Sequence, residues 1–253
     1  MSSTPYQPPV AYPLSVRGFF DQPSRWLWLV KWLLLIPHYI ILAFLWLAFW
    51  IVTVIAFFAI LFTTRYPKWL FDFNVGVIRW SWRVSFYGYA ALGTDRYPPF
   101  TLADVPDYPA RVDLEYPQQL NRWLPLVKWL LAFPQYLIVG ALVGSGYVVA
   151  TTMQDGQPVT YSTPSLIGAC VLIAAIGMLF TTRYPPGLFD LALGIDRWGY
   201  RLLVYVALMT DRYPPFRLDQ GSVDIEGPPQ SPATSDAWQV EQPPAYGPEA
   251  ERG

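Results

Sequence analysis

Residues 26–64 form an apolar stretch that limits what the rest of the chain can fold into. From residue 39 to residue 62 it contains no charged side chain, no amide, no glycine and no proline. An apolar run of more than about 18 residues is too long for a soluble core helix and fits the hydrocarbon of a bilayer. We therefore expect an integral protein of the cell membrane.

The composition supports this expectation and leaves little for catalysis. Of the 253 residues, 53% are hydrophobic and only 14% are charged, whereas roughly 25% of residues are charged in a soluble domain. The net charge of -1 argues against a nucleic-acid partner. One cysteine, Cys170, and one histidine, His38, leave no disulfide framework or thiolate metal site. Without a glycine-rich phosphate loop or a Ser-His-Asp set, we expect no enzyme activity and no cofactor.

The chain is a tandem duplication. Residues 61–67, Leu-Phe-Thr-Thr-Arg-Tyr-Pro, recur unchanged at 179–185, and residues 94–100, Thr-Asp-Arg-Tyr-Pro-Pro-Phe, recur unchanged at 210–216. Two identical heptapeptides in the same order indicate one unit copied. The repeats occupy residues 12–107 and 108–218, between a disordered N-terminal segment, 1–11, and a disordered Pro-rich acidic tail, 219–253.

The two copies differ by an insertion, which leaves the number of membrane crossings open. The spacing between equivalent residues grows from 97 at Lys31 and Lys128 to 118 at Arg65 and Arg183, so copy two carries 21 extra residues. Copy two is expected to form helices at about 123–150 and 165–182 with a polar loop between them. Copy one either crosses once or makes a tight hairpin.

Two arguments favour a hairpin in both copies, which gives four crossings and cytoplasmic termini. Copies with the same orientation need the same parity of crossings, and with two hairpins every Lys and Arg lies outside the external turns. Three crossings remain the alternative, since no turn residue lies near residues 45–50. Weak alternation at 15–19 and 111–116 predicts two short paired strands near the membrane surface.

The repeated phrases resemble a known family. Phe-Thr-Thr-Arg-Tyr-Pro, the following Leu-Phe-Asp with Arg-Trp, and the closing heptapeptide are similar to an uncharacterised bacterial membrane family, domain of unknown function 4389. The resemblance covers both repeats, about residues 12–218. It implies a membrane location and no established activity.

A polar stripe follows each apolar unit. Asp72, Gly76, Arg79 and Arg83 lie within about 40° of one line on a helix, and the stripe recurs at Asp190, Gly194, Arg197 and Arg201. Aromatic residues flank both stripes. A cationic stripe with aromatic flanks is typical of an amphipathic helix in the membrane plane.

Three interpretations of the stripe compete. In the first and most ordinary, the arginines pair with local acids and fix the copies against each other. In the second, they form a site for anionic lipid headgroups, because guanidinium groups suit phosphate. In the third, they line an intramembrane charge pathway, which we rank below the second because the long helices have no charge at their centres. The headgroup site would comprise Arg65, Arg79, Arg83, Arg96, Arg183, Arg197, Arg201 and Arg212.

The predicted fold class is an all-α membrane protein, a tandem repeat of a transmembrane helical hairpin plus an in-plane amphipathic helix, with short β-strands at the membrane surface. Gly140 and Gly144 form a small-xxx-small pair that permits close helix contact, within the chain or between protomers. We expect a structural or assembly role with an arginine-rich cytoplasmic rim, whose partners are anionic lipids, another membrane protein or a second copy. The alternative is a small transporter or channel subunit with its path at the repeat interface.

Overall fold

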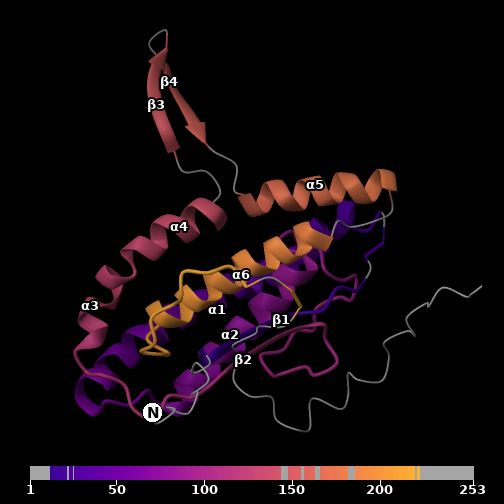
Figure 1. Cartoon of the computed structure of the whole chain (residues 1–253). Coiled ribbons are helices and arrows are strands. Elements are labelled where there is room, and N and C mark those ends of the chain that lie inside the picture. The colour runs from indigo at the N-terminus through magenta and orange to yellow at the C-terminus, as the bar shows by residue number, and fades with distance from the viewer. Residues whose placement is uncertain are drawn as a thin grey trace, which may run out of the picture.

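The structure is a computed structural model that describes residues 12–21, 23–24, 26–143, 148–154, 157–162, 166–181, 186–219 and 221–222. Its elements, labelled in Figure 1, are β1 (Leu14–Gly18), α1 (Trp28–Thr63), α2 (Lys68–Tyr87), β2 (Ala110–Leu114), α3 (Leu124–Leu131), α4 (Phe133–Val143), β3 (Val148–Gln154), β4 (Gln157–Ser162), α5 (Leu166–Thr181) and α6 (Pro186–Val206). The segment 1–11, nearly all of the tail 219–253, and the predicted residues Gly144 and Arg183 lie outside the described residues.

The apolar stretch forms one helix, and the hairpin expected inside residues 26–64 is wrong. All 36 residues of α1 are helical, with Pro37 inside the helix. The helix ends at Thr63, and the next residue, Thr64, has a φ of 59° and donates its backbone N–H to the carbonyl oxygen of Ile60 at 2.8 Å. The charge pattern favoured a hairpin, but no residue near the centre of α1 supplies a turn.

The second copy is interrupted where the first is continuous. α3 and α4 meet with a bend of 47°, at Ala132 and directly before Pro134. The expected polar loop contains a β-hairpin, in which β3 pairs antiparallel with β4, and α5 follows it. Among the described residues, α1 alone is long and apolar enough to cross a membrane as an unbroken helix. The bent pair α3–α4 is a second candidate if it counts as one span.

The two copies are joined about a local two-fold axis. β1 and β2 pair antiparallel, which confirms the pairing of the two expected short strands, and Val16 lies opposite its own equivalent, Val112. An antiparallel pair centred on equivalent residues places a two-fold axis between them. α2 and α6 also meet near this axis, because the rings of the equivalent residues Trp82 and Tyr200 are 5.5 Å apart.

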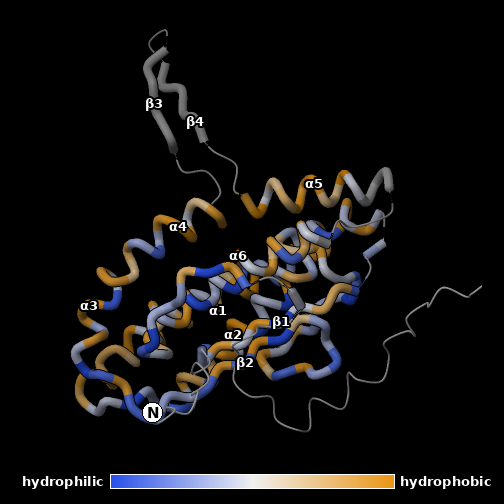
Figure 2. The backbone as a smooth tube through the Cα atoms, viewed as in Figure 1, coloured by the Kyte–Doolittle hydropathy of each residue, from blue (hydrophilic) through white to orange (hydrophobic). Residues whose placement is uncertain are grey.

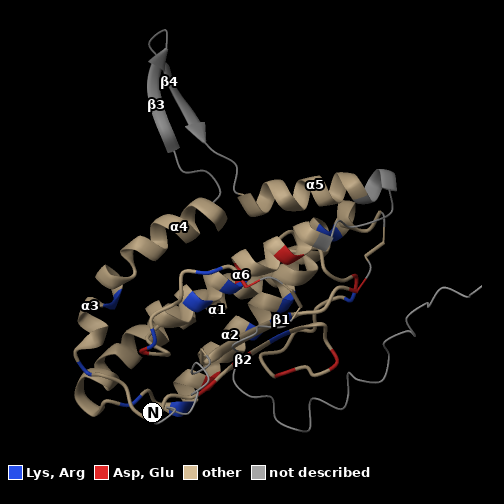
Figure 3. Cartoon of the chain, in the orientation of Figure 1, with Lys and Arg blue, Asp and Glu red and all other residues tan. Residues whose placement is uncertain are grey.

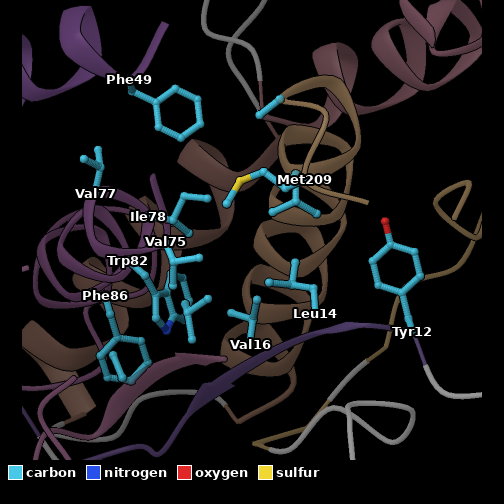
Figure 4. Packing of buried hydrophobic residues seen from close by; sticks show 14 of the residues in the cluster. Tyr12, Leu14, Val16, Phe49, Val75, Val77, Ile78, Trp82, Phe86 and Met209 are labelled. Atoms are coloured by element: carbon cyan, nitrogen blue, oxygen red, sulfur yellow. The ribbon is translucent and has the colours of Figure 1, made fainter. Parts of the chain in front are cut away.

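The main core lies between α2, α6 and the strand pair. Figure 4 shows Val75, Ile78 and Trp82 of α2 close to Leu14 and Val16 of β1, all members of one buried cluster. α2 buries 14 of its 20 residues, since it contacts α1 as well as β2. The expected amphipathic helix with a polar face open to headgroups is therefore wrong for α2, because protein covers that face.

One side of the molecule is apolar and the other carries charge. Figure 1 shows α6 between β1 on one side and α4 and α5 on the other. α4 and α5 contain no Lys, Arg, Asp or Glu, as Figure 3 shows for their described residues, and Figure 2 shows mostly apolar residues along them. In α1, only 22% of the most apolar 18-residue window is buried. The exposed large apolar side chains lie mainly on α1, α3, α4 and α5, and we call these four helices the apolar side.

Candidate functional site

A buried lysine joins the start of each apolar helix to the closing heptapeptide. Lys31 of α1 has no exposed surface; its Nζ donates to the carbonyl oxygen of Thr94 at 2.7 Å and lies 3.0 Å from the Asp95 carboxylate. Nζ also lies 4.5 Å from the centroid of the Tyr87 ring. The heptapeptide thus supplies a carbonyl and a carboxylate that compensate a cation buried in an apolar helix.

Copy two repeats this lysine site. Lys128 donates to the carbonyl oxygen of Thr210 at 2.7 Å, lies 2.8 Å from Asp211, and has its Nζ 5.1 Å from the centroid of the Tyr205 ring. The carboxylate contact accounts for the repeated aspartate, and in both copies the threonine hydroxyl accepts the backbone N–H of the arginine two residues later, at 3.1 Å for Thr94 and 3.2 Å for Thr210. In each copy the lysine thus connects the start of the apolar helix, α1 or α3, to the end of the buried helix that precedes the heptapeptide, α2 or α6.

The rest of the heptapeptide packs on the same apolar helix. The hydroxyl of Tyr97 donates to the carbonyl oxygen of Leu34 at 3.0 Å, and the Phe100 ring stacks on His38 with centroids 3.9 Å apart. His38 accepts a hydrogen bond from Trp80 Nε1 at 3.1 Å and is fully buried. In copy two Gln135 takes the place of His38 and accepts from Trp198 Nε1 at 2.6 Å. The contact needs only an acceptor, which both side chains provide.

The first arginine stripe faces protein backbone. Arg83 is 2% exposed, and its guanidinium donates to the carbonyl oxygens of Ala103, at 2.9 Å, and of Thr101. Burial lowers the pKa of Arg83 from its ordinary value. Arg79 donates through Nε to the carbonyl oxygen of Val112 at 3.0 Å. α2 is therefore bound both to the loop of its own copy and to the strand of the other copy.

The second stripe makes the equivalent contacts more deeply. Arg197 has no exposed surface and donates to the carbonyl oxygens of Val16 at 2.8 Å and of Asp219 at 2.7 Å. Arg201, also without exposed surface, pairs with the carboxylate of Asp219. Because Val16 belongs to copy one, Arg197 mirrors the contact of Arg79 with copy two.

Two tyrosines also form hydrogen bonds from one copy to the other. The hydroxyl of Tyr12 in copy one donates to the carbonyl oxygen of Arg212 in copy two at 3.4 Å. Its equivalent, Tyr108, donates to the carbonyl oxygen of Arg96 in copy one at 2.9 Å. The strand segment of each copy is therefore held by the helix and the closing heptapeptide of the other.

The eight predicted headgroup arginines divide into groups. Arg65, Arg96 and Arg212 are exposed, and we call these three the arginine rim. Arg83, Arg197 and Arg201 are buried, Arg79 is half-buried, and Arg183 lies outside the described residues. The structure does not bring all eight to one surface. Lipid binding by the rim remains a prediction.

The rim arginines lie near both ends of α1. Arg65 follows the end of α1, where the Thr64 carbonyl oxygen accepts from the Leu120 N–H at 2.9 Å. The next residue, Asn121, donates its N–H to Asp211 at 2.6 Å, which places Arg212 near the same end. Arg96 lies at the opposite end, beside the site of Lys31, and its Nε is 3.1 Å from the carboxylate of Asp21.

Of the predicted packing glycines, Gly140 is half-buried in α4.

A cavity of about 490 Å³ is lined by residues of both copies, and sequence reasoning missed its main polar residue. Asp196 of α6 lines it and is 8% exposed. The sequence contained a signal for Asp196, because the repeat aligns this aspartate with Ile78 of copy one. Ile78 is 1% exposed, so Asp196 stands at a position that is apolar and buried in the other copy. Within the described residues, no group of three His, Cys, Asp or Glu side chains could hold a metal ion.

Comparison with known proteins gives a family and no activity. A family model described as Domain of unknown function (DUF4389) matches residues 25–101 and 159–217, which together make up more than half of the chain. The two matched regions fall in the two repeats. No curated protein and no solved structure matches the chain. The chain belongs to the family of the Domain of unknown function (DUF4389), of which it carries two tandem copies.

Proposed function

We propose that the protein is a non-enzymatic structural or assembly protein of the cell membrane, which lies along the bilayer and contacts anionic lipid or a partner protein through the arginine rim. In this arrangement α1 and α3–α5 are in the hydrocarbon and the β1–β2 pair faces water. The observation that carries the proposal is the level of the charged strand pair, which α2 holds opposite the part of α1 between His38 and Thr53.

The apolar surface of α1 needs a cover. Phe44 is 70% exposed, Leu47 is 62% exposed and Phe62 is 75% exposed. With 36 residues, α1 is about 54 Å long. An apolar surface of this length far exceeds the patches that monomeric soluble proteins leave in water, so lipid is its natural cover.

Side-chain contacts fix the level of the strands along α1. Trp80 of α2 bonds to His38 of α1, and Asn74 of α2 bonds to Thr53 of α1. Arg79 lies between these two contacts and bonds to Val112 of β2. The strand pair therefore lies level with the part of α1 between His38 and Thr53, which is ten residues from either end of the helix.

This level is incompatible with an upright α1. If α1 crossed the bilayer, Arg17 and Asp113, which pair at 2.9 Å on the strands, would lie at the depth of the membrane centre. The Asp113 side chain is 30% exposed on the outer side of the strands, and an ionised group facing lipid at that depth costs at least about 2.5 kcal/mol. With α1 along the membrane, the strands face water and both ends of α1, with the arginine rim, reach headgroup depth.

The proposal replaces the multi-pass crossings expected from sequence and keeps the cytoplasmic side. The backbone N–H of Gly18 donates to the carbonyl oxygen of Ser222 at 3.1 Å, so the end of β1 and the last described residues lie together on the strand side. The exposed arginines favour the cytoplasmic face for that side.

Depth measurements test the orientation. Spin labels are placed at Val30→Cys, Leu47→Cys and Phe62→Cys in a chain whose own Cys170 is changed to Ala, with Asp107→Cys as an aqueous control. Accessibility to oxygen and to a water-soluble nickel chelate gives the depth of each label in vesicles. We expect similar depths at all three α1 positions. A deep label at 47 with shallow labels at 30 and 62 would show that α1 crosses.

Lipid retention tests the rim. In native mass spectrometry with defined lipids, the wild type should retain anionic lipid, and a triple variant, Arg65→Gln, Arg96→Gln and Arg212→Gln, should lose it. Lys68→Gln is the matched control, because Lys68 is an exposed cation that pairs with Asp72 at 2.7 Å. Equal retention by the triple variant and the control would remove the lipid contact from the proposal.

A small transporter or channel subunit is the second candidate, favoured by the cavity between the copies. Proteoliposomes loaded with a pH-sensitive dye test it. Asp196 is the buried carboxyl of this cavity. An external organic cation should exchange for its proton and drive proton efflux in the wild type, and it should not do so in Asp196→Asn. Absence of efflux from sealed vesicles of the wild type would refute exchange of a cation for a proton through this cavity.

A further inference from the structure

The cavity between the copies has the size and lining of a small-molecule site. Its volume of about 490 Å³ falls in the range of about 300–1,000 Å³ that is common for such sites. Trp46 of α1, Val143 of α4 and Ile167 of α5 form the part of its wall that belongs to the apolar side of the molecule. A ligand that dissolves in lipid could therefore reach the cavity.

The cavity contains one carboxyl group in an apolar setting. Asp196 is 8% exposed, and its Oδ2 has no hydrogen-bond partner among the described residues. The other ionisable groups of the lining are the phenols of Tyr89 and Tyr200, and the lining residues from α1, α4 and α5 are all apolar or aromatic. Burial raises the pKa of Asp196 well above its ordinary value.

Aromatic rings line the same cavity as this carboxyl. Trp46, Tyr89 and Tyr200 come from both copies and line the cavity together with Asp196. Aromatic faces attract organic cations, and the attraction strengthens when water is excluded. A buried carboxyl without a partner provides the missing counter-ion, since a buried charge must be paired.

We propose that this cavity binds a hydrophobic organic cation, with Asp196 as its counter-ion and the rings of Trp46, Tyr89 and Tyr200 around its cationic group. Burial favours the protonated form of the carboxyl in the empty site. When the cation enters, the proton leaves Asp196 for the buffer, and the carboxylate and the cation form a neutral pair. The binding site is independent of the arginine rim and does not require transport.

Calorimetry on the full chain in mild detergent tests the proposal. The probe is the phenethyltrimethylammonium ion, and its control is the neutral isostere in which carbon replaces nitrogen. The wild type should bind the cation at least about tenfold more tightly than Asp196→Asn does, a difference of about 1.4 kcal/mol. At about pH 6, repeated titrations in buffers of different ionisation enthalpy should show release of about one proton per bound cation, because an ordinary aspartate with a pKa of about 3.9 would already be ionised.

Asp196→Asn keeps the shape of the side chain and removes a buried ionisable group, so we expect it to fold. Asp190→Asn, at a half-buried aspartate two turns earlier on α6, is the matched control and should bind as the wild type does. Equal affinity of wild type and Asp196→Asn, equal binding of the neutral isostere, or binding without proton release would each overturn the proposal.

Discussion

Replacing Arg197 by methionine tests whether the buried arginines hold the copies together. Arg197 has no exposed surface and donates to two backbone carbonyls, of Val16 at 2.8 Å and of Asp219 at 2.7 Å. Each charge-assisted bond contributes about 1.5–3 kcal/mol, and removing the donor leaves two buried acceptors. Methionine fills similar volume and avoids the cost of burying a cation, which offsets part of the loss. We expect Arg197→Met to cost about 3 kcal/mol.

The matched variant is Arg79→Met. Arg79 makes the equivalent Nε bond to Val112 at 3.0 Å, but its side chain is 26% exposed and its ion pair with Asp113 is 3.6 Å long. Water can replace part of these contacts, so we expect a cost of about 1 kcal/mol. The copies thus provide two versions of one contact at different burial.

Thermal unfolding in mild detergent, followed by tryptophan fluorescence, measures both variants. For a chain of this length, 1 kcal/mol shifts Tm by about 2–4 °C, so Arg197→Met should lower Tm by about 6–12 °C and Arg79→Met by about 2–4 °C. If Arg79→Met lowered Tm as much as Arg197→Met does, burial would not set the strength of these contacts. An unchanged Tm for Arg197→Met would refute the reasoning.

Four further predictions follow from the packing. Gly76→Ala should lower Tm, because its Cβ would lie 2.8 Å from a leucine Cβ and 3.0 Å from a carbonyl oxygen, whereas Gly194→Ala, with its nearest contact at 3.3 Å, should be better tolerated; a larger loss for Gly194→Ala would contradict this. Asn74→Ala should cost about 1–3 kcal/mol in the same assay, since it leaves a buried tyrosine hydroxyl without its donor at 2.9 Å. Asp196 binds its proton more tightly in the folded chain than in the unfolded chain, so wild-type Tm should fall relative to that of Asp196→Asn as pH rises above about 4, through the raised pKa; a constant difference from pH 4 to 8 would be inconsistent with burial. Halves made by cutting between residues 107 and 108 should co-purify when expressed together and aggregate when expressed apart, and two stable separate halves would show that the exchange of strands is dispensable.

The sequence predicted the duplication, the two short strands and the helical character of the chain, because each depends on local pattern. It also predicted that the arginines of each stripe share a helix face. It could not predict what that face contacts, since the main partners of Arg83 and Arg197 are backbone carbonyls. Every residue has a backbone carbonyl, whatever its side chain, so the sequence does not mark these partners. A helical wheel therefore shows whether arginines share one helix face, but it does not show whether that face contacts lipid headgroups or protein.

The hairpin prediction failed for a different reason. It assumed that both copies have the same orientation, so that the parity of crossings had to match. The end of α1 lies beside the start of copy two, as the bond from Leu120 to Thr64 shows, and the strands pair antiparallel about Val16 and Val112. The copies therefore run in opposite directions along α1. The hairpin was predicted in order to place the positive charges on one side of the membrane. With the copies in opposite directions, these charges lie at both ends of α1 without a hairpin.

Two departures from two-fold symmetry meet at the cavity. The equivalent residues Ser85 and Leu203 both line it, so it lies close to the axis that relates the copies. Copy two differs from copy one there in two ways: Asp196 stands where copy one has Ile78, and the inserted β-hairpin separates Val143 from Ile167, which both line the cavity. The lysine sites and the exchanged strands, in contrast, are the same in both copies. Contacts that hold the copies together are thus duplicated, whereas the carboxyl in the cavity is unique, which is what a single binding site between two copies requires.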